Sequence, residues 1–162
     1  MSATGKTRET PSETRARLRR AARLAAVQAL YQMDIGRLGA GAVIREFREH
    51  RFGAADEGAE FVEADEDFFD ALVSGVVDRQ AKVDPAIDEL LAEGWRMERL
   101  DATVRAILRA AGYELFERTD VPARVVIDEY VDVANAFFDG SEPKFVNAAL
   151  DRCARQARPA EF

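Results

Sequence analysis

Residues 24–33 read LAAVQALYQM, ten consecutive positions without a charged side chain. Wound into a helix, the apolar members of this stretch point in every direction around the helix axis. A helix that is apolar on all sides is buried on all sides. The stretch therefore predicts one helix that passes through the core of the molecule, with other elements packed around it.

This central helix has a recognisable start and end. Residues 10–13, TPSE, have the form of a capping box, with the threonine as N-cap, the proline at the first helical position and the glutamate reaching back. Gly36 is expected to terminate the helix just after Asp34. A helix of this extent is about 36 Å long at ~1.5 Å per residue.

The N-terminal half of the helix, together with the residues before it, is strongly basic. Residues 1–23 hold seven basic and two acidic side chains, a net charge of +5, whereas the whole chain carries −7, which leaves −12 for residues 24–162. Such an asymmetry indicates that a polyanion docks at one place and is repelled elsewhere. The arginines of the helix form a stripe with a four-residue repeat and one neighbour beside it: Arg15, Arg19 and Arg23, with Arg20.

Helical spacing of apolar residues continues along the rest of the chain, and no stretch alternates long enough to predict a strand. The expected helices are one over 41–52, one capped by Asp65 and running through 68–77, one opened by Asp84-Pro85 and ended by Gly94, one over 100–115, one over 126–137, and one from a Ser141 cap through 153. Gly75 and Gly112 fall inside two of these helices, which indicates close helix–helix approach.

The sequence thus predicts an all-α protein with one compact domain of about seven helices over residues 10–158. A basic extension, residues 1–9, is expected to be disordered and residues 159–162 to form a short tail. An acidic loop is expected near residues 53–64. No apolar run reaches the ~18 residues of a membrane span, and no secretory signal is present. With a single cysteine, Cys153, these features favour a cytoplasmic protein without a membrane partner.

The residues that usually carry catalysis are scarce. His50 stands among charged residues and is expected to be solvated, and Cys153 lies on the apolar face of the last helix and is expected to pack in the core. The glycines at 36–41 lack the lysine and the preceding strand of a phosphate loop. The sequence therefore predicts no enzyme activity, no metal site and no cofactor.

The chemistry of RNA recognition is better represented. Single-stranded RNA is bound by cations that follow phosphates and by aromatic or amide groups that contact bases. Gln28 and Tyr31 follow the arginine stripe on the same helix, although core packing is at least as good an explanation for Tyr31. Lys144, Phe145 and Asn147 offer the same residue types at the start of the last helix, where core packing is the commoner fate of such a phenylalanine.

Three separated blocks resemble, in order, the bacterial antitermination factor family NusB. They are AVQALY at 26–31, ILRAAGYEL at 107–115 followed by DVP at 120–122, and KFVN at 144–147 followed by LD at 150–151. A weaker block covers residues 68–76. The resemblance extends from about Arg15 to Arg158 and departs from the family pattern in the long N-terminal extension, in Pro143 and in the acidic loop.

The resemblance implies two three-helix bundles that share a long first helix. It also implies binding of boxA RNA from ribosomal RNA leaders, jointly with the small-subunit ribosomal protein NusE, in a complex with other Nus factors on RNA polymerase. The implied RNA-contacting residues are Arg19, Arg20, Arg23, Gln28, Tyr31, Lys144 and Phe145, and Arg15 is added to them as a member of the arginine stripe. The implied NusE contacts are Glu93, Asp101, Arg105 and Asp132, and an acidic body suits a basic ribosomal protein.

Two other hypotheses stay open at this point. The basic helix could bind an acidic protein instead of RNA, which would make the chain a helical protein–protein scaffold. Ribosomal RNA cytosine methyltransferases carry a similar N-terminal helical domain, but they also need a methyl-donor domain, and this chain stops at Phe162. The sequence does not specify the oligomeric state.

Overall fold

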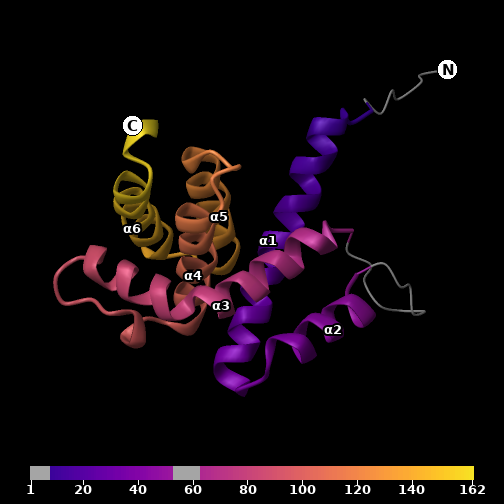
Figure 1. Ribbon diagram of the computed structural model, residues 1–162, viewed down its shortest axis with the longest axis horizontal. Helices are drawn as coiled ribbons and strands as arrows, with labels where there is room; N and C mark the ends of the chain where they lie inside the picture. Colours follow the sequence, from indigo (N-terminus) through magenta and orange to yellow (C-terminus); the bar gives the residue numbers. More distant parts are fainter. Residues whose placement is uncertain (1–7, 53–62) are drawn as a thin grey trace.

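A computed structural model describes residues 8–52 and 63–162 (Figure 1). The described residues form six α-helices and two short 3₁₀ segments, without a β-strand, which confirms the all-α prediction. Their bounds are α1 Pro11–Gly36, α2 Ala40–His50, α3 Glu66–Leu90, η1 Met97–Arg99, α4 Ala102–Glu117, α5 Ala123–Phe137, α6 Glu142–Ala157 and η2 Pro159–Glu161. Most of the predicted disordered extension and of the acidic loop lies outside the described residues.

Helix α1 begins at the predicted Thr10 cap, without the predicted return bond from the Glu13 side chain, and ends two residues later than predicted. The Glu13 backbone N–H donates to the Thr10 Oγ1 at 3.1 Å, and Pro11 occupies the first turn. Gly36 is the last helical residue, but the left-handed conformation that closes the helix belongs to Arg37, with φ of 52°. One side of the charge-free stretch lies in the core, where Val27 is wholly buried, but Tyr31 is 37% exposed, so the stretch is not buried on all sides as predicted.

The helix predicted to start at Asp84-Pro85 does not exist as a separate element. Helix α3 continues through Pro85 to Leu90, so there is one helix fewer than expected. An internal proline removes a backbone hydrogen bond and costs about 3 kcal/mol. Contacts on both sides of it offset this cost: Val83 and Ile87 are buried, and Asp84 accepts from Arg109 of α4 at 2.9 Å.

The predicted close approach at two glycines is confirmed, and it is the crossing of α3 and α4. A Cβ atom at Gly75 of α3 would overlap the ring of Tyr113. A Cβ atom at Gly112 of α4 would lie 2.8 Å from Ile87 Cδ1. Each helix therefore presents a glycine where the other's side chains reach its backbone.

Helix α1 joins two sets of helices. It packs against α2 and α3 on one side and against α4 and α5 on the other, while α4, α5 and α6 pack together (Figure 1). The N-terminal turns of α1 project beyond the other helices at the upper right of the view (Figure 1). This arrangement agrees with the expected fold of two bundles sharing a long first helix.

The last residues of the chain are tied to α4 and α5. The buried guanidinium of Arg158 donates to backbone carbonyls at the C-terminal end of α4, including those of Glu114 at 2.8 Å and Leu115 at 3.0 Å. The Glu161 carboxylate accepts from the Ala123 N–H at 3.0 Å and caps α5. The short tail expected over 159–162 thus contains a 3₁₀ turn whose Glu161 caps α5, and Arg158 just before the turn closes the end of α4.

Candidate nucleic-acid interface

The projecting half of α1 carries the cations that the sequence predicted as RNA contacts. Arg15 and Arg20 are exposed, and the Nε and Nη2 atoms of Arg20 donate to the two carboxylate oxygens of Glu129 of α5 at 3.2 and 3.3 Å. Arg17, which the arginine stripe did not include, lines the same hollow between α1 and α5 as Arg20. It pairs with Glu9 at 2.8 Å on the surface. The exposed Arg17–Glu9 pair contributes little and can exchange for a phosphate contact. The Arg20–Glu129 pair is held by two hydrogen bonds to a carboxylate that is 14% exposed, while the Arg20 side chain itself is 57% exposed.

The stripe itself turns from the surface into the core. A residue four positions along a helix is rotated by about 40° relative to the first, because each residue turns by ~100°. Arg15 is exposed, whereas the Arg19 side chain is about one-quarter exposed and lies with its Cζ 4.5 Å from the centre of the Phe68 ring. Arg23 completes the rotation and is buried.

The position of Arg23 corrects the expectation that it lies on the RNA-facing surface. Its Nε and Nη2 donate to the two carboxylate oxygens of Glu114, both at 2.9 Å, and Glu114 is wholly buried. Burial opposes the charge, but the hydrogen bonds and negative charge of Glu114 raise the pKa of Arg23 above its usual value. Burial and the same carboxylate raise the pKa of Tyr130, which packs beside the pair. Arg23 therefore joins α1 to α4.

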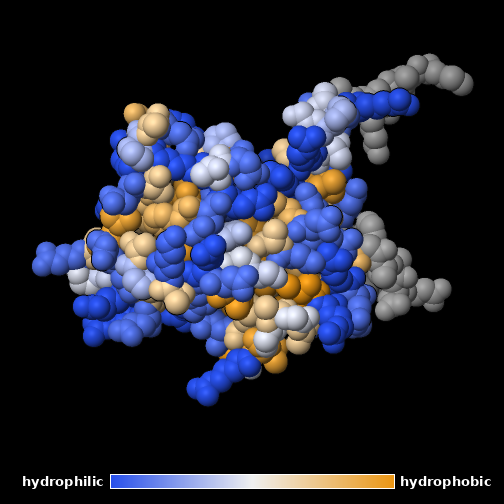
Figure 2. Space-filling view, viewed as in Figure 1, coloured by the Kyte–Doolittle hydropathy of each residue, from blue (hydrophilic) through white to orange (hydrophobic). Residues whose placement is uncertain are grey.

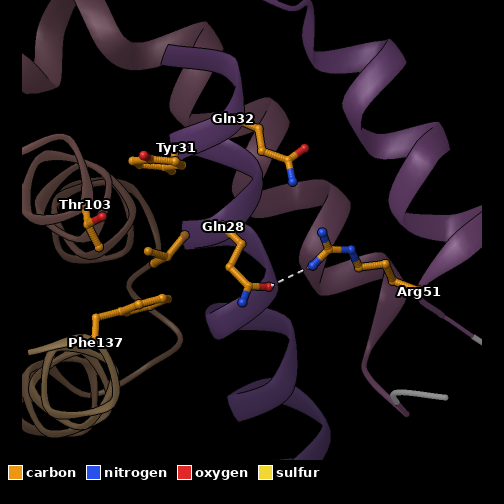
Figure 3. Close-up of a pocket in the computed structure, with 7 residues that line it drawn as sticks. Gln28, Tyr31, Gln32, Arg51, Thr103 and Phe137 are labelled. Carbon is orange, nitrogen blue, oxygen red and sulfur yellow. Dashed lines mark hydrogen bonds between the residues drawn. The ribbon is translucent and has the colours of Figure 1, made fainter. Parts of the chain in front are cut away.

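Gln28 and Tyr31 line an open hollow of about 370 Å³ between α1, α2, α4 and α5 (Figure 3). The fold brings two further residues to it that the sequence did not predict, Arg51 after α2 and Phe137 of α5. Arg51 Nη1 donates to Gln28 Oε1 at 3.3 Å (Figure 3). Tyr31 and Phe137 are 37% and 40% exposed, so two aromatic rings, an amide and a cation face solvent together.

The predicted residues on α6 occupy a separate place. Lys144 is exposed and lines a hollow between α5 and α6, together with Asp132. Phe145 is half-buried, and its ring centre lies 5.4 Å from that of Trp95. The Trp95–Phe145 pair borders the N-terminal end of α4, whose Thr103 lines the hollow around Tyr31. Lys144 and Phe145 thus line different hollows, and Asp132 lines both the hollow of Lys144 and the one beside Arg17 and Arg20.

The four residues predicted to contact NusE have different surroundings. Glu93 and Asp132 are exposed and lie apart, in a turn and on α5. Asp101 caps α4 by accepting from the Thr103 N–H at 2.8 Å. The Arg105 side chain is 15% exposed and donates to Asp34 at 2.7 Å and to the Met97 and Leu100 carbonyls. Arg105 therefore stabilises the fold, which leaves little of its guanidinium to a partner.

The described residues offer little else that could act chemically. Cys153 is wholly buried, and burial raises the pKa of its thiol to about 11. His50 is exposed at the end of α2. Within residues 8–52 and 63–162, no group of three or more metal-ligating side chains is close enough to hold an ion. None of the helices in these ranges is long and apolar enough to cross a membrane.

Comparison with known proteins places this arrangement among its relatives. The NusB family model matches residues 20–155. The transcription antitermination protein NusB of Maricaulis maris (strain MCS10) is 77% identical over 155 residues, covering 96% of this chain and 97% of the relative. The T. maritima NusB structure has a TM-score of 0.71 at 29% identity, covering 96% of this chain and 99% of that one.

A further solved structure contains the antitermination factors NusB and NusE in complex with double-stranded RNA. Its matching chain has a TM-score of 0.68 at 25% identity, with 85% of this chain and 96% of that chain covered. The family model and the M. maris relative both cover most of the chain, and the helical arrangement agrees with both solved structures. The chain belongs to the NusB family.

Proposed function

We propose that this protein is a non-enzymatic antitermination adaptor that binds boxA-type RNA of ribosomal RNA leaders together with NusE. In this role it joins other Nus factors on RNA polymerase, which then reads through terminators. Membership of the family and the names of its relatives support the antitermination role. The solved complex of a related NusB with NusE and double-stranded RNA supports NusE and RNA as the partners, and the single-stranded boxA form of the RNA is part of the proposal.

The observation that carries the proposal is the charge of the projecting part of α1. Arg15, Arg17 and Arg20 lie on the N-terminal half of α1, in the part of the chain with a net charge of +5, whereas residues 24–162 carry −12. Arg17 and Arg20 line the hollow beside α5. Figure 2 shows polar and charged residues covering this projection, with apolar surface gathered lower on the body. Cations concentrated on one element attract the phosphates of RNA there and set the direction in which the strand approaches.

Base contacts come from the other half of the same helix. Tyr31 lies eleven residues beyond Arg20, or about 16 Å along the axis at ~1.5 Å per residue. Its exposed ring, the Phe137 ring and the Gln28 amide share one hollow with Arg51. Aromatic rings stack on unpaired bases and amides bond to base edges. A strand that runs along α1 therefore meets cations first and base-contacting groups second.

A small RNA surface explains why a protein partner is needed. Three or four phosphate contacts bind weakly at physiological salt, and a second protein that extends the site raises the effective affinity without any new contact on this chain. The exposed acidic residues Glu93 and Asp132 are candidates to face a basic ribosomal protein. Asp101 and Arg105 are proposed to act indirectly, by fixing the α4 end that such a partner would touch.

Charge reversal on α1 tests the RNA-binding role. Arg15→Glu and Arg20→Glu are each expected to weaken binding of a boxA-type single strand, measured by fluorescence anisotropy. Arg79→Glu is the matched control, because Arg79 is an exposed arginine of α3 that lines neither the hollow of Arg17 and Arg20 nor the hollow around Tyr31. If all three variants lose RNA affinity equally, the effect comes from the net charge of the protein and not from a binding surface on α1. Loss of NusE binding with unchanged RNA binding would favour the protein–protein scaffold.

A further inference from the structure

The hollow between α1 and α5 combines apolar surface with both signs of charge. It measures about 350 Å³. Small ligands occupy clefts of roughly 300–1,000 Å³, so the hollow is large enough for one nucleotide. Apolar side chains of both helices line it, among them Leu24 and Val133. Its charged lining residues are two arginines of α1 and two carboxylates of α5: Arg17, Arg20, Glu129 and Asp132.

The two carboxylates of this hollow differ in what they already bind. Both oxygens of Glu129 accept from Arg20, and the Glu129 side chain is 14% exposed. Asp132 is exposed, and no residue in the described part of the chain donates a hydrogen bond to its side chain. The hydrogen bonds to Glu129 raise the pKa of Arg20, and the negative charge of Asp132 adds to this effect. Asp132 thus lies near Arg20 with its oxygens open to a ligand.

A carboxylate beside phosphate-binding arginines selects among polyanions. Asp132 repels a phosphate unless the same ligand donates a hydrogen bond to it. An ionised carboxylate is only an acceptor, and so are the phosphate and ring oxygens of a nucleic-acid backbone. The ribose 2′-hydroxyl is the one backbone group that can donate, and it is the group by which proteins distinguish RNA from DNA. Dinucleotide-binding folds use the same pairing of an acidic side chain with a ribose hydroxyl.

We propose that the hollow between α1 and α5 holds one ribonucleotide of the bound RNA, with its phosphate at Arg17 and Arg20 and its 2′-hydroxyl donating to Asp132. Glu129 holds the Arg20 guanidinium through Nε and Nη2, which leaves Nη1 for the phosphate. The proposal rests on the proposed RNA-binding function and adds sugar selectivity to it. It assigns Asp132 to the RNA and not to NusE.

The position of the hollow places it on the RNA surface described above. Helix α1 contributes Leu24 to this hollow and Gln28, one turn later, to the hollow around Tyr31. Helix α5 contributes Ala136 to this hollow and the next residue, Phe137, to the other. The two hollows therefore follow one another along the same pair of helices. A strand lying between α1 and α5 passes from the arginines to the aromatic rings.

Sugar substitution in a labelled RNA tests the proposal with the full-length protein. The probes are a ten-nucleotide boxA-type strand, its all-deoxyribose counterpart, and ten strands that each carry one 2′-fluoro nucleotide. Fluorine keeps the RNA-like sugar conformation but cannot donate a hydrogen bond. Binding is measured by fluorescence anisotropy at low salt, with and without NusE. One 2′-fluoro position is expected to weaken binding about tenfold, the effect of losing one hydrogen bond to a charged group.

Variants of α5 assign this effect to one side chain. Asp132→Ala is expected to bind the parent strand and that 2′-fluoro strand equally. It is also expected to bind the deoxyribose strand up to about fivefold more tightly than the unchanged protein, because one surface like charge is removed. A damaged fold would lower both affinities. Asp132→Asn, which keeps an acceptor oxygen, is expected to retain part of the sugar selectivity.

Asp128→Ala is the matched control for the change of charge. Asp128 is an exposed carboxylate one turn earlier on α5, and it lines the hollow beside Lys144 but not the one beside Arg17 and Arg20. This variant is expected to distinguish the parent strand from the 2′-fluoro strand as the unchanged protein does.

The outcomes separate the sugar site from the underlying function. If the strands bind but no 2′-fluoro position weakens binding, or if Asp132→Ala keeps the full effect, the sugar site is refuted and the adaptor role stands. If Asp132→Ala loses NusE binding and keeps the sugar selectivity, Asp132 faces the protein partner and the proposal is overturned. If no strand binds at low salt with NusE present, both the site and the RNA-binding function fall.

Discussion

Replacing Arg23 by methionine is expected to destabilise the protein severely without removing an RNA contact. The two 2.9 Å hydrogen bonds of Arg23 hold a Glu114 carboxylate that has no exposed surface. Removing one partner of a buried ion pair leaves an uncompensated charge and costs about 3–5 kcal/mol. In a domain of this size each kcal/mol lowers the melting temperature by about 2–4 °C, so the expected decrease is roughly 6–20 °C.

Calorimetry of Arg23→Met gives the melting temperature, and a second variant isolates the cause. Arg23→Met combined with Glu114→Leu removes both charges and is expected to recover most of the lost stability. At a temperature where Arg23→Met is folded, its affinity for RNA is expected to equal that of the unchanged protein. An unchanged melting temperature together with an RNA affinity as low as that of Arg20→Glu would refute the structural role.

Three further predictions concern stability. Gly112→Ala is expected to lower the free energy of unfolding by about 1–3 kcal/mol, because the added Cβ atom would overlap Ile87. Gly41→Ala, which has open space around it, is expected to be neutral or stabilising. Urea denaturation compares the two variants. Pro85→Ala restores a backbone donor inside α3 and is expected to raise the melting temperature; a decrease would show that the proline stabilises the helix. Burial raises the pKa of the Cys153 thiol from 9 to about 11. The contribution of this thiol to stability is therefore complete below pH 9 and is lost as the pH rises to 11. The free energy of unfolding is expected to decline over this interval, and to decline less in Cys153→Ala.

Much of the fold could be predicted from local patterns. Five of the ten residues in the charge-free stretch at 24–33 are buried, and the caps at Thr10 and Asp65 form as expected. The expectation of burial on all sides was wrong for the face that carries Gln28, Tyr31 and Gln32, which lines an open hollow. The Pro85 boundary was wrong because proline is a strong local signal for a helix start, whereas the contacts that carry α3 through it come from α4, more than twenty residues away along the chain.

The site was less predictable, because side chains from distant elements complete it. A four-residue repeat indicates that side chains share one helix face, but over eight residues their direction around the helix axis shifts. Only the position of the buried Glu114, which binds Arg23, shows that the Arg23 side chain lies in the core. Arg51 and Phe137 join Gln28 through the packing of α2 and α5 on α1. Trp95 lies in a turn and belongs to no periodic pattern, so the sequence gives no way to predict its contact with Phe145.

The salt dependence of RNA binding tests the central claim most directly. A labelled boxA-type single strand is titrated with the protein by fluorescence anisotropy at several salt concentrations, with and without NusE. Three or four phosphate contacts predict a log–log slope of roughly −2 to −3, at ~0.7 per contact for single strands. Binding with that slope, tighter with NusE and weaker for a scrambled RNA, is the predicted result. No binding under any condition, including low salt with NusE present, would contradict the account.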